Sequence, residues 1–240
     1  MDTDAALDLS GESILITGGG GALGQTIVDT LRARGALVES VDLTTGVDAA
    51  DPAAIDGVLD RLTDEGRLPT IVMCHAGAVG THPLIDYPLD GFDALVRSNL
   101  RSAYVTARQA ARRWTSGGMP GHLLFTTSWV AEHPWPEIGP YIATKAAITA
   151  MMRQFALELA PHGIRANAIA PGIVGAGMAL HQWQTNDDYR RRAGSAIPLG
   201  ALQTTQSVAD ACLFLCSRMA SYMTGSVLTV DGGASLRPMD

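Results

Sequence analysis

The chain has 240 residues, of which 47% are hydrophobic and 17% charged, so it can bury the core of one α/β domain, although length alone also allows two small ones. Its net charge is −7, and no basic run is longer than Arg190–Arg192. We therefore expect neither nucleic acid nor an anionic membrane as a partner.

The sequence carries no recognisable targeting or membrane segment. Its acidic first residues, Met1–Asp4, are not followed by an apolar signal core, and no apolar run approaches the roughly 20 residues that span a bilayer. The three cysteines, Cys74, Cys212 and Cys216, form no metal or disulfide pattern. We expect buried reduced thiols, no metal site and a cytoplasmic protein.

Short apolar runs alternate with helical patterns along the chain. In chain order we expect a strand at 13–17, a helix at 23–34 closed by Gly35, a strand at 36–43, a helix at 52–64, a strand at 70–74, helical periodicity over 89–114, a strand at 122–127, a helix at 141–160, a strand at 165–170, a helix at 207–216 and a strand at 227–230. This alternation predicts an α/β fold: one doubly wound, Rossmann-type parallel sheet flanked by helices on both faces, as a single domain over 1–240.

A glycine-rich segment, Thr17–Gly24, joins the first strand to the first helix. Glycines at this point allow a tight turn and a close backbone approach, and the helix N-terminus favours a pyrophosphate. Many tight turns have similar sequences, so the segment alone only suggests a dinucleotide site.

Asp42 at the end of the second strand strengthens the dinucleotide interpretation. A carboxylate there can accept hydrogen bonds from the 2′- and 3′-hydroxyls of a ribose, and it would repel a 2′-phosphate. Neither the glycine segment nor Leu43 supplies a compensating Arg or Lys. We therefore expect NAD(H) in preference to NADP(H); the alternative is that Asp42 is an ordinary turn residue.

Tyr141 and Lys145 lie four residues apart in an expected helix, so the phenol and the ammonium project from one face. A cation about 5 Å away, at an effective dielectric constant of about 20, favours the phenolate by roughly 3 kcal/mol, or about two pKa units. Tyr141 is therefore a candidate proton-transfer group. Taken alone, the Tyr141–Lys145 spacing usually marks an exposed helix surface. Ser128 alone would be interpreted as a loop-capping hydroxyl, and Asn99 alone as an ordinary helical asparagine.

Taken in order, these motifs resemble the classical short-chain dehydrogenase/reductase family over residues 9–233. The motifs are Thr17–Gly24, Asp42, Asn99, Ser128, Tyr141, Lys145 and Pro171–Gly172. The resemblance implies a nicotinamide-dependent alcohol/carbonyl oxidoreductase, commonly a homotetramer.

The resemblance also implies a role for each site residue. Tyr141 would be the acid/base, Lys145 would lower its pKa and bind the nicotinamide ribose, Ser128 would hydrogen-bond the reacting oxygen, and Asn99 would hold a water in a proton relay. The implied cofactor-binding residues are Gly18, Gly20, Gly21, Leu23, Asp42, Asp48, Ala49, Ala76, Gly77, Tyr141, Lys145, Pro171, Gly172 and Val174.

Several features depart from the family pattern. Ala22 replaces the middle glycine of the loop, which is tolerated if the backbone is helical there. Cys74–Gly77 replaces Asn-Asn-Ala-Gly, and we expect His75 to be a structural substitute rather than a base. Ala176 replaces a threonine that contacts the nicotinamide carboxamide. The link between the second and third strand units is short, so we expect its usual helix to be missing.

The substrate site is expected between two segments, the loop 129–140 and a lid inserted at 177–200. The candidate substrate residues are Trp129, His133, Trp135, His181 and Trp183. The tryptophans suit a ring or a sugar face, and the histidines suit hydroxyls, unless one or two tryptophans lie in subunit contacts. Arg190–Arg192 can attract a carboxylate or phosphate, although a solvated helix face is the commoner case.

The leading hypothesis is an NAD(H)-dependent enzyme that interconverts a secondary alcohol and a ketone, with a small polyol, sugar or cyclic alcohol favoured as substrate. The first alternative is a 3-oxoacyl-thioester reductase, which is disfavoured because acyl carrier protein and this chain are both acidic. Enoyl reductases of this type usually space Tyr and Lys more widely. A non-catalytic cofactor-sensing protein would typically have lost Tyr141 or Lys145.

Overall fold

Six parallel strands form one sheet within residues 3–236, the range that this computed structural model describes; residues 1–2 and 237–240 of the expected domain lie outside it. The strands are β1 (Ser13–Thr17), β2 (Leu37–Val41), β3 (Ile71–Cys74), β4 (Gly121–Thr126), β5 (Ile164–Pro171) and β6 (Val227–Val230). Their order is β2-β1-β3-β4-β5-β6, and each neighbouring pair is parallel. The doubly wound Rossmann-type sheet is confirmed.

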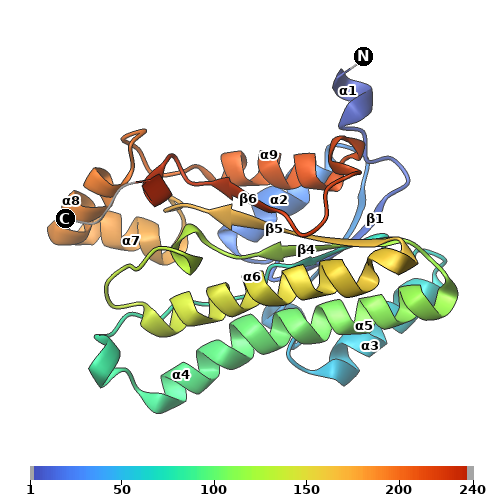
Figure 1. The fold of residues 1–240 in the computed structure, drawn as a ribbon, viewed down its shortest axis with the longest axis horizontal. Coiled ribbons are helices and arrows are strands. Elements are labelled where there is room, and N and C mark those ends of the chain that lie inside the picture. The colour runs from blue at the N-terminus through green and yellow to red at the C-terminus, as the bar shows by residue number, and fades with distance from the viewer. Residues whose placement is uncertain (1–2, 237–240) are drawn as a thin grey trace.

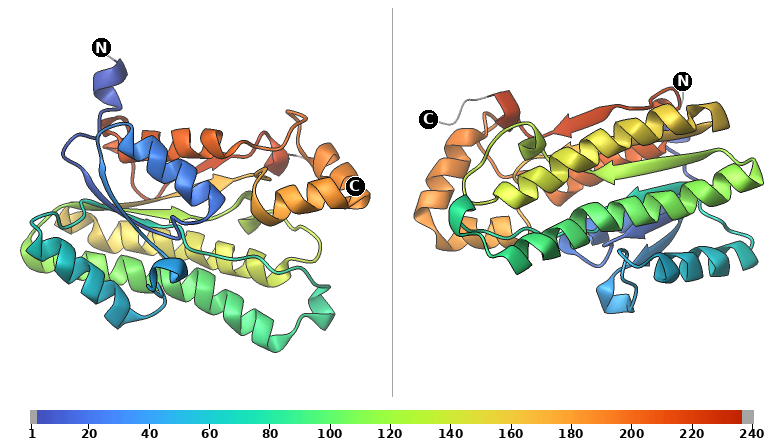
Figure 2. Two further views of the ribbon diagram at one scale, coloured as in Figure 1. Left: turned by 180° about the vertical axis from the view of Figure 1, so that it is seen from behind. Right: turned by 60° about the horizontal axis from the view of Figure 1, so that its bottom comes forward.

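Helices cover both faces of the sheet (Figures 1 and 2). One face carries α2 (Ala22–Arg32) and α9 (Thr205–Cys216), and the other carries α3 (Pro52–Asp64), α5 (Ser102–Gly117) and α6 (Gly139–Leu159). The helices α7 (Gly177–Thr185) and α8 (Asp187–Ala196) extend past one end of the sheet, at the left of Figure 1. The remaining short elements are α1 (Thr3–Ala6), α4 (Leu89–Leu95) and the 3-10 turns η1 (Leu43–Thr45), η2 (Leu84–Asp86), η4 (Trp129–Ala131), η5 (Ala160–His162), η6 (Arg218–Ala220) and η7 (Ala234–Leu236).

A separate hydrophobic core fills each side of the sheet. Along β1, Leu15 joins the core beneath α3, α5 and α6, whereas Ile14 and Ile16 join the core beneath α2 and α9. Because both faces of the central strands β1 and β3 are buried, β3 and the segment Ile14–Ile16 of β1 are continuously apolar rather than alternating. The three cysteines lie in these two cores as free thiols, as expected from the sequence.

Two segments differ from a regular pattern. The expected helix at 89–114 consists of α4, a π-helical segment η3 (Val96–Arg101) and α5, because the chain gains a residue in the turn that contains Asn99. After β2, the chain makes only the turn η1 before it reaches Asp48, so the expected absence of a helix in this link is confirmed.

The sheet brings the functional segments to one edge. The chain runs from β1 through α2 to β2 on one side and returns to β3 on the other side of β1, so the strand order reverses between β1 and β3. Ligands of doubly wound folds bind at the carboxyl ends of the strands at such a reversal. Among residues 3–236, no helix has the length and apolar character needed to cross a membrane.

A buried histidine lies in the middle of the sheet. His122 on β4 is 3% exposed, and its Nε2 lies 3.1 Å from Nδ2 of Asn167 on β5. Its Nδ1 is buried and has no partner among the described residues. Burial, aided by the charge of Arg165, lowers the pKa of His122 to about 3. The folded protein therefore holds this imidazole neutral.

This histidine predicts acid sensitivity. The folded pKa of His122, about 3, lies below the unfolded value of about 6.5. The stability that the neutral imidazole contributes is therefore fully present above pH 6.5 and is lost as the pH falls towards 3. Within this window each pH unit costs up to about 1.4 kcal/mol. We expect His122→Gln to flatten the dependence of the unfolding free energy on pH, measured by urea denaturation at several pH values. Parallel curves for the variant and the wild type would contradict the prediction.

Candidate active site

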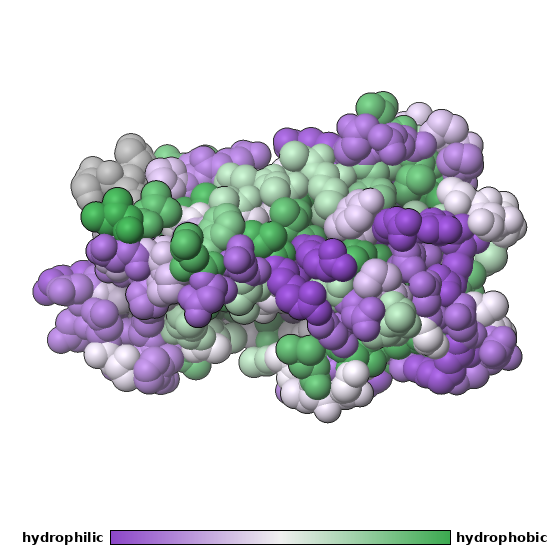
Figure 3. Space-filling view, turned by 90° about the horizontal axis from the view of Figure 1, so that it is seen from below, coloured by the Kyte–Doolittle hydropathy of each residue, from purple (hydrophilic) through white to green (hydrophobic). Residues whose placement is uncertain are grey.

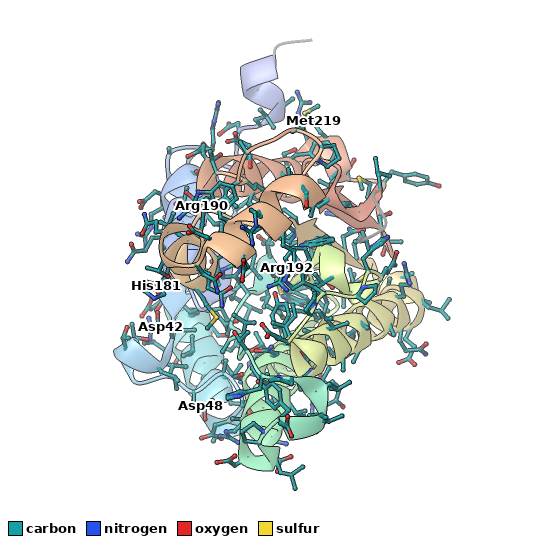
Figure 4. The ribbon with its side chains drawn as sticks, turned by 90° about the vertical axis from the view of Figure 1, so that its left-hand side faces the viewer. Asp42, Asp48, His181, Arg190, Arg192 and Met219 are labelled. Carbon is teal, nitrogen blue, oxygen red and sulfur yellow. The ribbon has the colours of Figure 1, made fainter. Side chains whose placement is uncertain are left out.

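A cavity of about 760 Å³ opens at the carboxyl ends of the strands. Its wall includes every cofactor-binding residue expected from the sequence, which are Gly18, Gly20, Gly21, Leu23, Asp42, Asp48, Ala49, Ala76, Gly77, Tyr141, Lys145, Pro171, Gly172 and Val174. Ser128 also lines the cavity, whereas Asn99 lies behind the wall. Figure 4 looks onto this edge, with Asp42 and Asp48 on one flank and Arg192 nearer the middle.

The glycine segment is shaped by close backbone contacts. Gly18 has a φ of +76°, and a Cβ there would lie 2.7 Å from the Cα of Ala76. A Cβ at Gly20 would collide with the carboxylate of Asp42. Gly21 precedes α2 and offers no side-chain cap, so the first N–H groups of the helix are free to bind an anion. Ala22 is the first residue of α2, so its methyl group fits a helical backbone.

Asp42 is held by hydrogen bonds from two directions. Its Oδ1 accepts hydrogen bonds from the backbone N–H groups of Thr44 (2.7 Å) and Thr45 (3.2 Å) and from the Thr44 hydroxyl. Its Oδ2 accepts one from the N–H of Gly20 at 2.7 Å. These bonds, first of all the one from the Thr44 hydroxyl, hold the pKa of Asp42 below its usual value. The carboxylate is therefore ionised, and within the described residues it forms no ion pair.

Hydrogen bonds also fix the opposite flank of the cavity, around Gly172 and Val174. The N–H of Gly172 donates to the carbonyl of Val230 (2.9 Å) and to Oε1 of Gln203 (2.8 Å), and Val174 forms a bridge with Gln203. A Cβ at Gly172 would lie 2.6 Å from the Cα of Asp231. A cavity lined by glycines at the N-terminus of α2, with the acidic residue Asp42 beside them, fits a dinucleotide.

Ser128, Tyr141 and Lys145 meet beside this cavity. Ser128 follows the end of β4, and Tyr141 is the third residue of α6, one turn before Lys145. Ser128 and Tyr141 both line the cavity, and the Ser128 side chain acts on the pKa of the Tyr141 phenol. The Nζ of Lys145 lies 5.6 Å from the centroid of the Tyr141 ring and donates to the carbonyl of Thr126 at 2.8 Å. Three groups expected from separate parts of the sequence thus form one cluster.

The pKa of Tyr141 differs from the sequence-based expectation. Removal from water raises the pKa of the phenol, and the neighbouring Ser128 side chain acts in the opposite direction. Burial lowers the pKa of Lys145 to about 8. The expected lowering by the ammonium is not dominant in the protein alone, because desolvation is larger and the Nζ is directed at the carbonyl of Thr126.

Asn99 anchors the loop after β3. Its side chain is fully buried in the π-helical segment, where Oδ1 accepts from the N–H of Ala78 (2.7 Å) and Nδ2 donates to the carbonyl of Ala78 (2.9 Å). The same Nδ2 donates to the hydroxyl of Thr144 on α6 at 3.1 Å. The amide thus binds protein groups on both sides and links the loop to the helix that carries Tyr141.

His75 is held by hydrogen bonds to neighbouring strand residues. Its Nδ1 lies 2.9 Å from the hydroxyl of Thr126, and its backbone N–H donates to the hydroxyl of Thr17 at 3.2 Å. Burial, aided by the charge of Lys145, lowers the pKa of His75 to about 4. The imidazole is neutral at neutral pH, in agreement with the expected structural substitution.

An aromatic cluster closes the part of the cavity beyond Ser128. The rings of Trp129 and Trp135 meet edge to face at 5.5 Å, and Trp135 meets Tyr189 edge to face at 6.4 Å. All three residues line the cavity. Tyr189 was missed in the sequence analysis, although its spacing to Ala193 on α8 indicates the buried side of that helix.

Three expected substrate residues lie outside the cavity wall. His133 stacks on Trp129, and its Nδ1 lies 3.2 Å from the carbonyl of Trp129, so the ring packs behind the wall. Trp183 packs towards Gly194 between α7 and α8. His181 is exposed on α7, at the margin of Figure 4 and away from Arg192. Helical phase in α7, which the sequence did not fix, turns His181 and Trp183 away from the cavity, whereas His133 lies in the bend after η4.

The described residues contain no group of three or more His, Cys, Asp or Glu side chains that could hold a metal ion.

The comparisons with known proteins agree with this geometry. A family model described as enoyl-(acyl carrier protein) reductase matches residues 5–235. L-xylulose reductase of Mesocricetus auratus is 31% identical over 245 residues, which cover 95% of this chain and 98% of that protein.

Two solved structures share the fold over nearly the whole chain. A short-chain type dehydrogenase/reductase from Mycobacterium marinum is similar at a TM-score of 0.87 and 29% identity, covering 97% of this chain and 98% of its own. A 3-ketoacyl-(acyl-carrier-protein) reductase from Brucella melitensis, complexed with NADH, is similar at a TM-score of 0.85 and 28% identity, covering 95% of this chain and 100% of its own.

The contacts of Asn99 predict a structural effect. Asn99→Ala leaves the N–H and carbonyl of Ala78 without their side-chain partner, so we expect a loss of about 1–3 kcal/mol in unfolding free energy, measured by urea denaturation. Ser98→Ala, which removes a neighbouring hydroxyl, is the control and should cost less than about 1 kcal/mol. Equal stability of the two variants would refute the anchoring role.

Proposed function

Because this chain belongs to the short-chain dehydrogenase/reductase family and is an NAD(P)-dependent oxidoreductase of alcohols and ketones, we propose that it uses NAD(H) and acts on a small polyol, sugar or cyclic secondary alcohol. The observation that carries the proposal is that Ser128, Tyr141 and Lys145 come together in the wall of a glycine-lined cavity. These groups can hold the oxygen of a substrate and exchange its proton.

In the proposed mechanism the protein positions the substrate and handles the proton. When bound, the nicotinamide supplies hydride transfer. During oxidation the Oη of Tyr141 takes the proton of the substrate hydroxyl, while the Oγ of Ser128 donates a hydrogen bond to the same oxygen. During reduction Tyr141 returns the proton to the carbonyl oxygen. Its raised pKa in the protein alone keeps the proton available for this direction.

Lys145 is proposed to balance the charge at Tyr141. It is the single lysine of the chain, and its ammonium is buried beside the phenol. With a pKa of about 8, it is largely protonated at neutral pH and stabilises a phenolate by Coulomb attraction. Asn99 is proposed to act indirectly, since its amide binds Ala78 and Thr144. This positioning role replaces the expected water-holding role for its side chain.

The substrate class is proposed from the aromatic wall and from one relative. Trp129, Trp135 and Tyr189 present ring surfaces next to Ser128, which suit the apolar face of a sugar or a ring. The relative from Mesocricetus auratus is named as a reductase of the ketose L-xylulose. The second candidate, a 3-oxoacyl-thioester reductase, is favoured by the Brucella melitensis structure and opposed by the net charge of −7, because acyl carrier protein is acidic.

The preference for NAD(H) is proposed from Asp42. Its carboxylate lies against the glycine loop, is ionised and is not neutralised by an ion pair within the described residues. A ribose hydroxyl can donate a hydrogen bond to Oδ2, whereas a 2′-phosphate would be repelled.

The remaining proposals concern the lid, the assembly and the location. We propose that residues 177–200, which contain α7 and α8 and contribute Met178, Ala179 and Tyr189 to the cavity wall, form the substrate lid. Figure 3 shows hydrophobic residues among hydrophilic ones on one side of the molecule. Tyr104 on α5 and Leu157 on α6 are exposed, and the face of α4, α5 and α6 is proposed to join subunits in a homotetramer. A cytoplasmic location agrees with the free buried cysteines.

The cofactor proposal is tested with Asp42→Asn. A carboxylate and a phosphate charge about 5 Å apart repel by about 1–3 kcal/mol, so the variant should bind NADPH about 10-fold or more tightly than the wild type, and NADH more weakly. Fluorescence titrations with NADH and NADPH measure both affinities. Asp51→Asn, which changes the cap of α3, serves as the control and should leave both unchanged. Equal affinity of the wild type for NADH and NADPH would contradict the proposed preference for NAD(H).

The proton-transfer role is tested with Tyr141→Phe. The variant keeps the ring but loses the Oη, so it should bind NADH normally and lose at least about 10³-fold in kcat, because the proton has no acceptor. NADH formation from a panel of polyols, sugars, cyclic alcohols and 3-hydroxyacyl esters measures turnover. Tyr222→Phe, at a fully exposed position, is the control. Activity of Tyr141→Phe close to that of the wild type would overturn the mechanism.

A further inference from the structure

Three polar atoms in the aromatic wall of the cavity have no partner in the protein. The wall consists of Trp129, Trp135 and Tyr189, which are 6%, 8% and 7% exposed. Within the described residues, neither indole N–H donates a hydrogen bond, and the Tyr189 hydroxyl neither donates nor accepts one. Buried Trp and Tyr side chains usually find a partner for their polar end, as Trp114 does by donating to the carbonyl of Pro69 at 2.8 Å.

These three atoms are open to the cavity rather than sealed in the protein. Among the described residues, the buried side-chain atoms without a partner are Thr106 Oγ1, His122 Nδ1, Arg192 Nε and Gln203 Nε2. None of them belongs to the aromatic wall, so its two N–H groups and its hydroxyl keep accessible surface. Because the three wall residues line the cavity and are otherwise buried, a molecule in the cavity can reach these atoms.

Tyr189 has a fixed position in this wall. Its backbone N–H donates to Oδ1 of Asn186, the N-cap of α8, at 3.0 Å. Its ring meets Trp135 edge to face at 6.4 Å, and Trp135 is also covered by the guanidinium of Arg192 at 5.3 Å. Figure 4 shows Arg192, three residues further along α8, near the middle of the edge where the cavity opens. The hydroxyl is thus held beside the cavity by contacts made elsewhere on the residue.

The chemistry of the three atoms matches a hydroxyl group. Burial raises the pKa of Tyr189, while the charge of Arg192 acts in the opposite direction. The phenol is therefore protonated at neutral pH, so it can both donate and accept, whereas the indole N–H groups only donate. An alcohol oxygen can pair with either kind of group. An alkyl chain in the same place would leave all three atoms without a partner, which is costly in a site closed to water.

The charged residues of the cavity wall lie elsewhere. Asp42 and Asp48 lie on the flank that holds the cofactor in the proposed function, and Lys145 lies beside Tyr141. The neighbours of the aromatic wall, such as Val130 and Ile138, are apolar. This part of the cavity is therefore suited to neutral oxygen groups rather than to anions.

We propose that Tyr189 binds a second hydroxyl of the substrate, distinct from the oxygen that reacts at Ser128 and Tyr141. The N–H groups of Trp129 and Trp135 supply further donors to oxygens of the same molecule. This inference rests on the proposed function and narrows its substrate class to polyhydroxylated molecules, in place of cyclic alcohols with a single hydroxyl. Tyr189 is then a residue that determines specificity.

The test compares ketones in which a hydroxyl replaces a methyl group. The pairs are 4-hydroxycyclohexanone with 4-methylcyclohexanone and 5-hydroxypentan-2-one with hexan-2-one, reduced by the wild type with NADH or NADPH, whichever supports the faster reaction. We expect kcat/KM to be about 5- to 10-fold higher for the hydroxy ketones, because only these pair with the Tyr189 hydroxyl. Equal values within both pairs would overturn the inference.

A substitution assigns the preference to Tyr189. Tyr189→Phe removes the hydroxyl and keeps the ring contact with Trp135, so the ratio of kcat/KM within each pair should fall to about 1. Tyr222→Phe, the same change at a fully exposed position, is the matched control and should keep the wild-type ratio. An equal loss for both members of a pair in Tyr189→Phe would leave the ratio unchanged. That result would show a purely structural role for the hydroxyl and overturn the inference.

A binding measurement separates this inference from the proposed function. Quenching of tryptophan fluorescence reports binding next to Trp129 and Trp135 without turnover. If the wild type reduces no ketone but binds 4-hydroxycyclohexanone more tightly than 4-methylcyclohexanone, and Tyr189→Phe removes the difference, the proposed function fails and the hydroxyl site stands. If the wild type reduces both ketones equally well and Tyr189→Phe leaves their ratio unchanged, the function stands and the inference fails.

Discussion

The parallel sheet is the constraint on which the site depends. Since every strand pair is parallel, the carboxyl ends of β1, β2, β3, β4 and β5 meet at one edge, and residues far apart in the sequence become neighbours there. Asp42 follows β2, Ser128 follows β4 and Pro171 ends β5. The reversal of strand order between β1 and β3 opens the crevice that these residues line. The helices on both faces bury the apolar strands and fix this edge.

A buried polar network holds the segments that carry Tyr141 and Lys145 in place. Lys145 reaches the carbonyl of Thr126, Asn99 binds Ala78 and Thr144, and the two helical segments they occupy pack together. Each bond satisfies a group that would be costly to bury alone. The same burial raises the pKa of Tyr141 and lowers that of Lys145, because it disfavours the charged form of each group.

The two ends of the cavity are built on different principles. At the cofactor end, short backbone contacts and strand ends give a rigid cradle, such as the approach of Gly18 to Ala76. At the substrate end, side chains of the lid pack on the aromatic wall, and Arg192 stacks on Trp135. Backbone geometry tolerates few residue types, whereas side-chain packing permits many. On the proposed function, substrate choice would depend mainly on the side chains of residues 177–200, and cofactor binding on the backbone at the strand ends.

The sequence by itself determined the parallel α/β fold, the glycine segment, Asp42 and the Ser128–Tyr141–Lys145 set, because these depend on local periodicity and on motifs of fixed spacing. It did not determine the π-helical turn at Asn99, the raised pKa of Tyr141 or the orientation of α7 and α8. His133, His181 and Trp183 lie outside the cavity, whereas Tyr189 lines it and Arg192 lies against its aromatic wall. Only the tertiary structure decided these points, because helix phase, burial and pairing arise from contacts between segments distant in the chain.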